Sequence, residues 1–195
     1  YGLVLSLKPD YAEAHNNLGN ALRDLGKLEN AVASYHKALG LKADYAEAHN
    51  NLGNALFELD RSEEAVASYR KALAIKPDYA EAHNNLGVVL QAQGKVDEAA
   101  AQIDLALSHK PEQDGWRIRK ALLLPVIPYS KQDTQVRRDT LAKAVKDLMK
   151  QNLTVSNPVL EVGTTNFYLA YQDQKNNRAL MEDIAKLYIA ACPKL

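Results

Sequence analysis

The stretch DYAEAHNNLGNAL at Asp10–Leu22 occurs again, letter for letter, at Asp44–Leu56. Its first ten letters, DYAEAHNNLG, occur a third time at Asp78–Gly87, so that each copy begins 34 residues after the one before it. A fixed period of this length indicates one structural unit, made of two helices and a turn, that is repeated along the chain. This repeat decides the fold of more than half of the sequence.

The first helix of each unit is expected to begin after an aspartate, which accepts hydrogen bonds from the free backbone N–H groups of the first turn. A glutamate three residues later completes a pair that resembles a capping box. The helix is expected to end at a glycine in the left-handed conformation, which an aspartate replaces in the middle repeat. The residues are Asp10, Asp44 and Asp78 at the start, Glu13, Glu47 and Glu81 in the first turn, and Gly26, Asp60 and Gly94 at the end.

The second helix of each unit carries small and large apolar residues at helical spacing. Its alanines allow neighbouring helices to approach closely, and a tyrosine fills the larger gap in the first two repeats. Prolines at 9, 77 and 111 end these helices, while an alanine at 43 takes that place once. The positions expected to pack are Ala31, Tyr35, Ala38 and Leu41, then Ala65, Tyr69, Ala72 and Ile75, and finally Ala99, Ile103, Ala106 and Leu107.

The period, with these small-residue, aromatic and proline positions, is typical of tetratricopeptide repeats, and the sequence resembles that family. Such repeats stack, because no helix pair can bury its apolar face alone. We therefore expect an all-α fold, with a curved tetratricopeptide solenoid at 1–111 and a helical cap or junction region at 112–195. The solenoid would begin with the last helix of an earlier repeat, at Tyr1–Leu7. The whole repeats are Ala12–Tyr45, Ala46–Tyr79 and Ala80–Pro111.

The first helices are expected to line a concave groove, and solenoids of this kind usually bind peptides or partner proteins there. A polar stripe runs along the first helices, opposite to the packing residues. Asparagines dominate it, and an amide can pair with both the C=O and the N–H of a bound peptide. The candidate peptide-binding residues are Asn17, Asn20, Asp24, Asn51, Asn54, Glu58 and Asn85. The alternative is that these asparagines orient turns or only solvate a surface.

Two other ligand classes are disfavoured by the same helices. Chaperone-binding tetratricopeptide domains hold a carboxylate with Lys and Arg, whereas the stripe here is acidic or neutral. His15, His49 and His83 recur at one position, but neighbouring helices lie about 8–10 Å apart. Since the ligands of one metal ion each lie about 2 Å from it, we expect structural histidines and no metal site.

After Pro111 the repeat pattern stops, and four further helices are expected. One of them, Lys131–Asn152, is amphipathic, and core packing is the favoured role of the aromatic residues in the others. The four helices are Asp114–Leu124, Lys131–Asn152, Thr164–Gln172 and Asn177–Ala191. The residues expected in the core are Trp116, Ile118, Val136, Leu141, Val145, Leu148, Met149, Phe167, Tyr168 and Tyr171.

Two stretches of this region, DGWRIRKALLLPVIPYS from Asp114 and TNFYLAYQDQKNNRALMEDIAKLYIAACPKL from Thr165, resemble bacterial SPINDLY-type O-GlcNAc transferase-like proteins. In that family a TNFYLAYH-like segment joins the repeat arm to the catalytic domain, and Gln172 stands here where a histidine often follows. The resemblance extends to the asparagines, since one asparagine per repeat grips the backbone of a bound peptide in such arms. It implies an arm that recruits protein substrates for a glycosyltransferase domain, which would follow Leu195.

The alternative is a free-standing adaptor that uses the same groove to assemble a complex. An enzyme complete within these residues is a third and weaker possibility. We identify no catalytic residue, no cofactor site and no glycine-rich nucleotide loop in the sequence.

Composition excludes some partners and favours one compartment. Lys+Arg and Asp+Glu both number 24, and no long basic run occurs, so nucleic acid is not an expected partner. The longest apolar run, Ala121–Ile127, is too short to cross a bilayer. Cys192 is the single cysteine, which makes a reducing compartment, the cytoplasm, the expected location.

Overall fold

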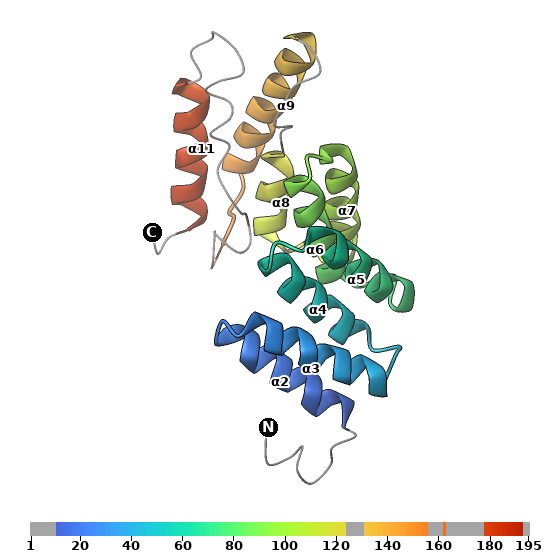
Figure 1. Ribbon diagram of the computed structural model, residues 1–195. Helices are drawn as coiled ribbons and strands as arrows, with labels where there is room; N and C mark the ends of the chain where they lie inside the picture. The colour runs from blue at the N-terminus through green and yellow to red at the C-terminus, as the bar shows by residue number, and fades with distance from the viewer. Residues whose placement is uncertain (1–10, 124–130, 156–161, 163–177, 193–195) are drawn as a thin grey trace. The chain divides into compact units, whose positions relative to one another are not determined.

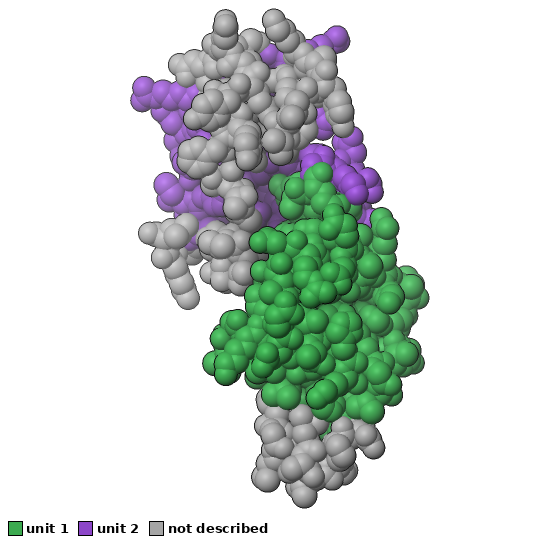
Figure 2. Space-filling model, viewed as in Figure 1, with its two compact units in different colours: residues 1–93 green, residues 94–195 purple. Residues whose placement is uncertain are grey.

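The computed structural model describes residues 11–123, 131–155, 162 and 178–192 (Figure 1). Within these ranges the secondary structure is helical, with no strand, which confirms the predicted all-α class. The chain divides into two compact units, residues 1–93 and 94–195, which Figure 2 distinguishes by colour. Unit 1 contains α2 (Ala12–Asp24), α3 (Leu28–Leu41), α4 (Ala46–Glu58), α5 (Ser62–Ile75) and α6 (Ala80–Ala92). Unit 2 contains α7 (Val96–His109), α8 (Asp114–Ala121), α9 (Lys131–Met149) and α11 (Arg178–Ala191).

The turns inside the repeats have the predicted left-handed conformation. The backbone φ is +70° at Gly26 and +76° at Gly94, and it is +59° at Asp60, where the middle repeat lacks the glycine. The helices before these turns, α2, α4 and α6, all end within two residues of them. The chain therefore keeps the turn even where an aspartate must adopt a conformation that favours glycine.

The capping of the first helices was predicted wrongly. The residue before each helix is a tyrosine, Tyr11, Tyr45 or Tyr79, and none of these three side chains makes a capping hydrogen bond. Instead, the carbonyl of each tyrosine accepts the backbone N–H four residues later, at 3.1–3.2 Å. Asp44 and Asp78 lie in the preceding turns, and Asp10 lies outside the described residues. The helices therefore start one residue later than the capping pattern indicated.

The core of unit 1 is built around two buried tyrosines. Tyr35 and Tyr69 are almost fully buried, and each ring lies against a glycine of the preceding first helix. A Cβ atom at Gly19 would lie 2.5 Å from the Tyr35 ring, and one at Gly53 would lie 2.6 Å from the Tyr69 ring. Glycine is therefore required at this place because a side chain would occupy the space of the ring. Burial raises the pKa of Tyr35 to about 12, which keeps its hydroxyl protonated.

Most other packing positions of the second helices are also confirmed. The alanines at 31, 38, 65, 72, 99 and 106 and the isoleucine at 103 have no measurable exposure. Two positions were predicted wrongly, since Leu41 is 43% exposed and Ile75 is 39% exposed. Both lie at the last residue of a second helix, where the neighbouring repeat no longer covers them.

The helix pairs of unit 1 stack in chain order, as predicted. Each of α3 and α5 packs on the first helix of its own repeat and on that of the next, and the first helices α2, α4 and α6 also contact one another. By contrast, an open pocket lies between α3 and α5. Because the first helices are closer together than the second helices, they line the inner face of the curve.

Unit 2 has an apolar core of its own, shared by α8, α9 and α11 and by residues 153, 155 and 162. Ile118, Leu141, Val145 and Leu187 are its most buried large side chains. The prediction was wrong for two residues of α9, because Val136 is 58% exposed and Met149 is 40% exposed. The helices expected at Tyr1–Leu7 and Thr164–Gln172, and the aromatic residues Phe167, Tyr168 and Tyr171, lie outside the described residues.

Candidate peptide-binding surface

The polar residues predicted from the sequence lie on α2, α4 and α6, the helices of the inner face. We name their surface the asparagine face, and it consists of Asn17, Asn20, Asp24, Asn51, Asn54, Glu58 and Asn85. The asparagines are half-buried, while the two acidic residues are exposed. The face therefore presents amide groups from three consecutive repeats, at positions that repeat every 34 residues.

Two of these asparagines donate hydrogen bonds to the preceding repeat. The amide nitrogen of Asn51 donates to the side-chain oxygen of Asn16 at 3.1 Å, and that of Asn85 donates to the oxygen of Asn50 at 3.1 Å. Asn85 also donates to the oxygen of Asn54 at 3.0 Å. These amides therefore join each first helix to the one before it, which is a structural role that the sequence did not reveal.

The residues that sequence reasoning missed are the partners in these bonds. Asn16 and Asn50 are buried, with exposures of 0% and 4%. Asn84, their equivalent in the third repeat, is 6% exposed and donates to the side-chain oxygen of Asn85 at 3.4 Å. The signal was present as the doublet NN in every repeat. Asparagine is a poor helix former and costly to bury without partners, so a recurring buried doublet indicates paired amides.

Asn20 and Asn54 have their carbonyl oxygens occupied by tyrosine. The hydroxyl of Tyr35 donates to Asn20, and that of Tyr69 donates to Asn54, both at 2.8 Å. The amide nitrogens of these two asparagines make no hydrogen bond with the described residues. Each of these amides therefore keeps two N–H donors that have no partner among the described residues.

The amide groups that remain available differ along the face. Asn17 makes no side-chain hydrogen bond with any residue that the structure describes, and the side-chain oxygen of Asn51 likewise accepts none. Both N–H groups of Asn85 are occupied. The capacity to bind a further polar group is therefore greatest at Asn17 and falls toward Asn85.

The electrostatic character of the face is acidic. Asp24 and Glu58 share Arg23, whose guanidinium lies 3.8 Å from one carboxylate and 3.9 Å from the other. Both carboxylates are well exposed, so that these long contacts hold them only weakly. Glu13 and Glu47 add two exposed carboxylates at the first turns of α2 and α4. The face suits a neutral or basic ligand better than an acidic one.

Two of the three recurring histidines, His49 and His83, have a structural role. The Nε2 atom of His49 lies 3.1 Å from the carbonyl oxygen of Ala43, and that of His83 lies 3.0 Å from the carbonyl oxygen of Pro77. Each ring thus holds the turn that precedes its own helix. Burial lowers the pKa of His49, which favours the neutral ring. In the described part of the chain, no three His, Cys, Asp or Glu residues are grouped as metal ligands would be.

The helix pairs, the left-handed turns and the period of the chain have a counterpart among known families. A family model described as the TPR repeat matches residues 19–60 and, overlapping with them, residues 53–94. These residues are tetratricopeptide repeats. The asparagine face is therefore the inner face of a stack of tetratricopeptide repeats. No curated protein sequence matches the chain.

Solved structures with the same fold include several tetratricopeptide proteins. A crystal structure of MamA is 27% identical, covers 77% of this chain and 83% of that one, and has a TM-score of 0.65. The TPR domain of Arabidopsis OM64 is 23% identical over 68% of this chain and 94% of that one, with a TM-score of 0.52. The first TPR domain of Spaghetti (RPAP3), bound to the HSP90 peptide SRMEEVD, is 20% identical over 69% and 93%, with a TM-score of 0.51. These similarities establish an all-α tetratricopeptide superhelix.

The helices of the described residues give no indication of a membrane segment. None of them combines the length and the apolar character that crossing a bilayer requires.

Proposed function

We propose that the tetratricopeptide repeats of unit 1 bind an extended segment of a protein partner on the asparagine face. The observation that carries this proposal is a set of amide atoms on the inner face that have no partner among the described residues. They are the whole amide of Asn17, the N–H groups of Asn20 and Asn54, and the side-chain oxygen of Asn51. An extended peptide has one donor and one acceptor per residue, and such amides can pair with both. The Spaghetti domain, which has the same fold, was solved with a peptide bound, and this supports the proposal.

Charge distinguishes the expected ligand from the one in that structure. The bound peptide SRMEEVD has two consecutive glutamates and a terminal aspartate. Asp24 and Glu58 would repel such a ligand, since only Arg23 offsets them on this part of the face. A peptide with lysine in place of those acidic residues is expected to bind more tightly than SRMEEVD itself.

The test uses Asn17, because its side chain has no described partner and its loss removes no internal hydrogen bond. Extended peptides would be selected by phage display on the whole chain and their affinities measured by calorimetry. Asn17→Ala is expected to weaken binding roughly two- to twelvefold, the value of one hydrogen bond, and to leave the melting temperature unchanged. Asn30→Ala, on the exposed side of α3, is the matched control and should change neither.

Asn51→Ala supplies an internal comparison. This variant should bind the same peptide more weakly. It should also have a free energy of unfolding lower by about 1–3 kcal/mol, because the buried Asn16 oxygen loses its donor. If a peptide that crosslinks to the asparagine face binds Asn17→Ala and wild-type protein equally, the amides are not the recognition device.

We further propose that this chain is the arm of an O-GlcNAc transferase-like enzyme and recruits its protein substrates in the cytoplasm. The support is the resemblance of the stretches at Asp114 and Thr165 to bacterial SPINDLY-type proteins, in which a junction region leads to the catalytic domain. A free-standing adaptor with the same peptide-binding face is the second candidate. The reading frame of the parent gene after Leu195 separates them: a glycosyltransferase domain is expected there, and an early stop codon would leave the adaptor.

A further inference from the structure

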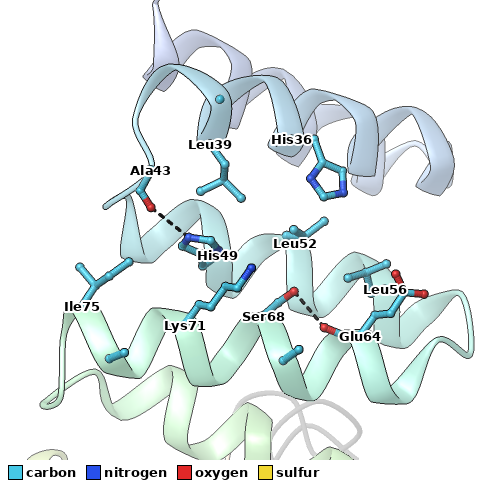
Figure 3. Close-up of a pocket in the computed structure, with 13 residues that line it drawn as sticks. His36, Leu39, Ala43, His49, Leu52, Leu56, Glu64, Ser68, Lys71 and Ile75 are labelled. Atoms are coloured by element: carbon cyan, nitrogen blue, oxygen red, sulfur yellow. Dashed lines mark hydrogen bonds between the residues drawn. The ribbon is translucent and has the colours of Figure 1, made fainter.

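The pocket between α3 and α5 lies on the outer side of the helix stack of unit 1, away from the asparagine face. It has a volume of about 710 Å³ and opens between α3 and α5, with Leu52 and Leu56 of α4 among its lining (Figure 3). Small residues form part of its lining. One of them is Gly40, where an added Cβ atom would meet nothing within 4 Å. We name this feature the outer pocket.

Part of the apolar lining of the outer pocket is left uncovered by the repeat stack, although Leu52 and Leu56 at its floor are only 4% and 2% exposed. Ile75, which the sequence pattern assigned to packing between helices, is 39% exposed at its rim. Leu39 is half-buried in the wall formed by α3. Removing aliphatic surface of this kind from water makes the binding of a partner more favourable.

The outer pocket has one cationic side chain, that of Lys71, without an ion pair among the described residues. His36 points into it from α3 and Lys71 from α5, on opposite walls (Figure 3). Neither makes a hydrogen bond or an ion pair with the residues that the structure describes. Glu64, the acidic residue of the lining, is held by Arg61 through two hydrogen bonds of 2.7 and 2.8 Å. The available charge is therefore positive, and it flanks an apolar floor.

The remaining polar groups of the pocket are already used. The Ser68 hydroxyl donates to the carbonyl of Glu64 at 2.9 Å, and the His49 ring binds the carbonyl of Ala43. An extended strand would bring unpaired backbone groups against these aliphatic walls, which is costly. A helix satisfies its own backbone and can present apolar side chains on one face.

We propose that the outer pocket binds a short amphipathic helix of a partner protein, with apolar side chains against Leu39 and Ile75 and an acidic side chain between His36 and Lys71. The pocket follows α5 from Glu64 to Ile75, which at 1.5 Å per residue is about 17 Å, or three helical turns. This site differs from the asparagine face in position, charge and ligand conformation.

The probe is a fluorescein-labelled, hydrocarbon-stapled helix of roughly four turns, with leucines at i, i+4 and i+7 and a glutamate at i+3. A second probe carries lysine in place of the glutamate. In fluorescence anisotropy the glutamate probe is expected to bind the whole protein more tightly than the lysine probe, by roughly two- to fivefold at low salt. Lys71→Glu should invert that preference, and higher salt should reduce it.

Gly40 provides the test of position. Gly40→Trp places a large side chain at the pocket and is expected to reduce the affinity for the glutamate probe about tenfold or more. Gly40→Ala, the matched control, adds one methyl group and should bind normally. Circular dichroism should show both variants fully helical, and peptides of the asparagine face should bind both as they bind wild type.

Three results would overturn the inference. They are equal affinity for the two probes, unchanged binding to Gly40→Trp, and saturable binding of decanoate at this pocket in a protein that binds neither helix. The last result would identify a site for an apolar carboxylate instead of a partner helix. The peptides of the asparagine face are measured on the same variants. The inference about the outer pocket can therefore fail while peptide binding to the asparagine face is still observed.

Discussion

At the scale of single residues, Gly53 lies in close contact with the buried ring of Tyr69. A Cβ atom at Gly53 would lie 2.6 Å from the ring, so that Gly53→Ala must displace a side chain that is almost fully buried. We expect a loss of about 1–3 kcal/mol in the free energy of unfolding, measured by urea denaturation. Gly40→Ala is the control, and the open space there predicts a small gain in stability instead. A neutral Gly53→Ala would show that the ring can move at little cost.

The same tyrosines predict how stability depends on alkaline pH. Burial raises the pKa of Tyr35 to about 12, above the ordinary value of 10.0, and it also raises the pKa of Tyr69. The unfolded chain therefore releases these protons first, so their contribution to stability is complete below pH 10 and is lost as the pH rises through about 12.

Thermal melts between pH 9 and pH 12 would measure this loss as a fall in melting temperature. In Tyr35→Phe the fall should be smaller, because one ionisable hydroxyl is absent. At neutral pH the free energy of unfolding of this variant should be lower by about 0.5–1.5 kcal/mol, since the hydrogen bond to Asn20 is removed. An alkaline transition of unchanged size in Tyr35→Phe would assign it to other groups.

At the scale of helices and turns, Asp60 is the residue with the most unusual backbone. Its φ of +59° lies in the left-handed region, and no side-chain hydrogen bond with the described residues compensates for it. Asp60→Gly is expected to stabilise the turn between α4 and α5 by about 0.5–1 kcal/mol. Gly26→Asp should have the opposite effect in the preceding repeat. Chemical denaturation of both variants checks the prediction, and a destabilised Asp60→Gly would contradict it.

The helices and turns show which features a sequence reveals. The left-handed turns and the buried tyrosines follow from the local pattern. Glycine indicates the turn, alanine the close approach of two helices, and the aromatic residue the larger gap between them. The sequence did not indicate that Tyr11, Tyr45 and Tyr79 are the residues before α2, α4 and α6. Their backbone carbonyls accept the hydrogen bonds of the first turn, and any residue could supply such a carbonyl. The bonds of Asn51 to Asn16 and of Asn85 to Asn50 were missed because they join residues 35 apart, and a single helical pattern cannot show which amide faces which. The outer pocket depends on the spacing of whole helices, so no local pattern indicates it.

At the scale of the whole molecule, the core of unit 2 is a cluster from α8, α9 and α11, and Leu141 is 2% exposed in it. Leu141→Ala is expected to cost about 2–5 kcal/mol, through lost burial and the cavity that remains. Hydrogen exchange should locate the loss in α8, α9 and α11, while α2–α5 keep their protection, because repeat proteins couple mainly between neighbours. Uniformly faster exchange along the chain would show instead that the two units unfold together.

The asparagine bonds between repeats have a consequence for how the gene can change. Each bond joins the first asparagine of one NN doublet to the second asparagine of the next, and the copies at Asp10, Asp44 and Asp78 share ten letters. If recombination removed residues 46–79, Asn85 would follow the α2–α3 hairpin and could donate to Asn16 as Asn51 does now. A duplication would likewise recreate the same pair at the new junction. The repeat stack can therefore lengthen or shorten by whole repeats in one genetic step, without new residues being needed at the junction.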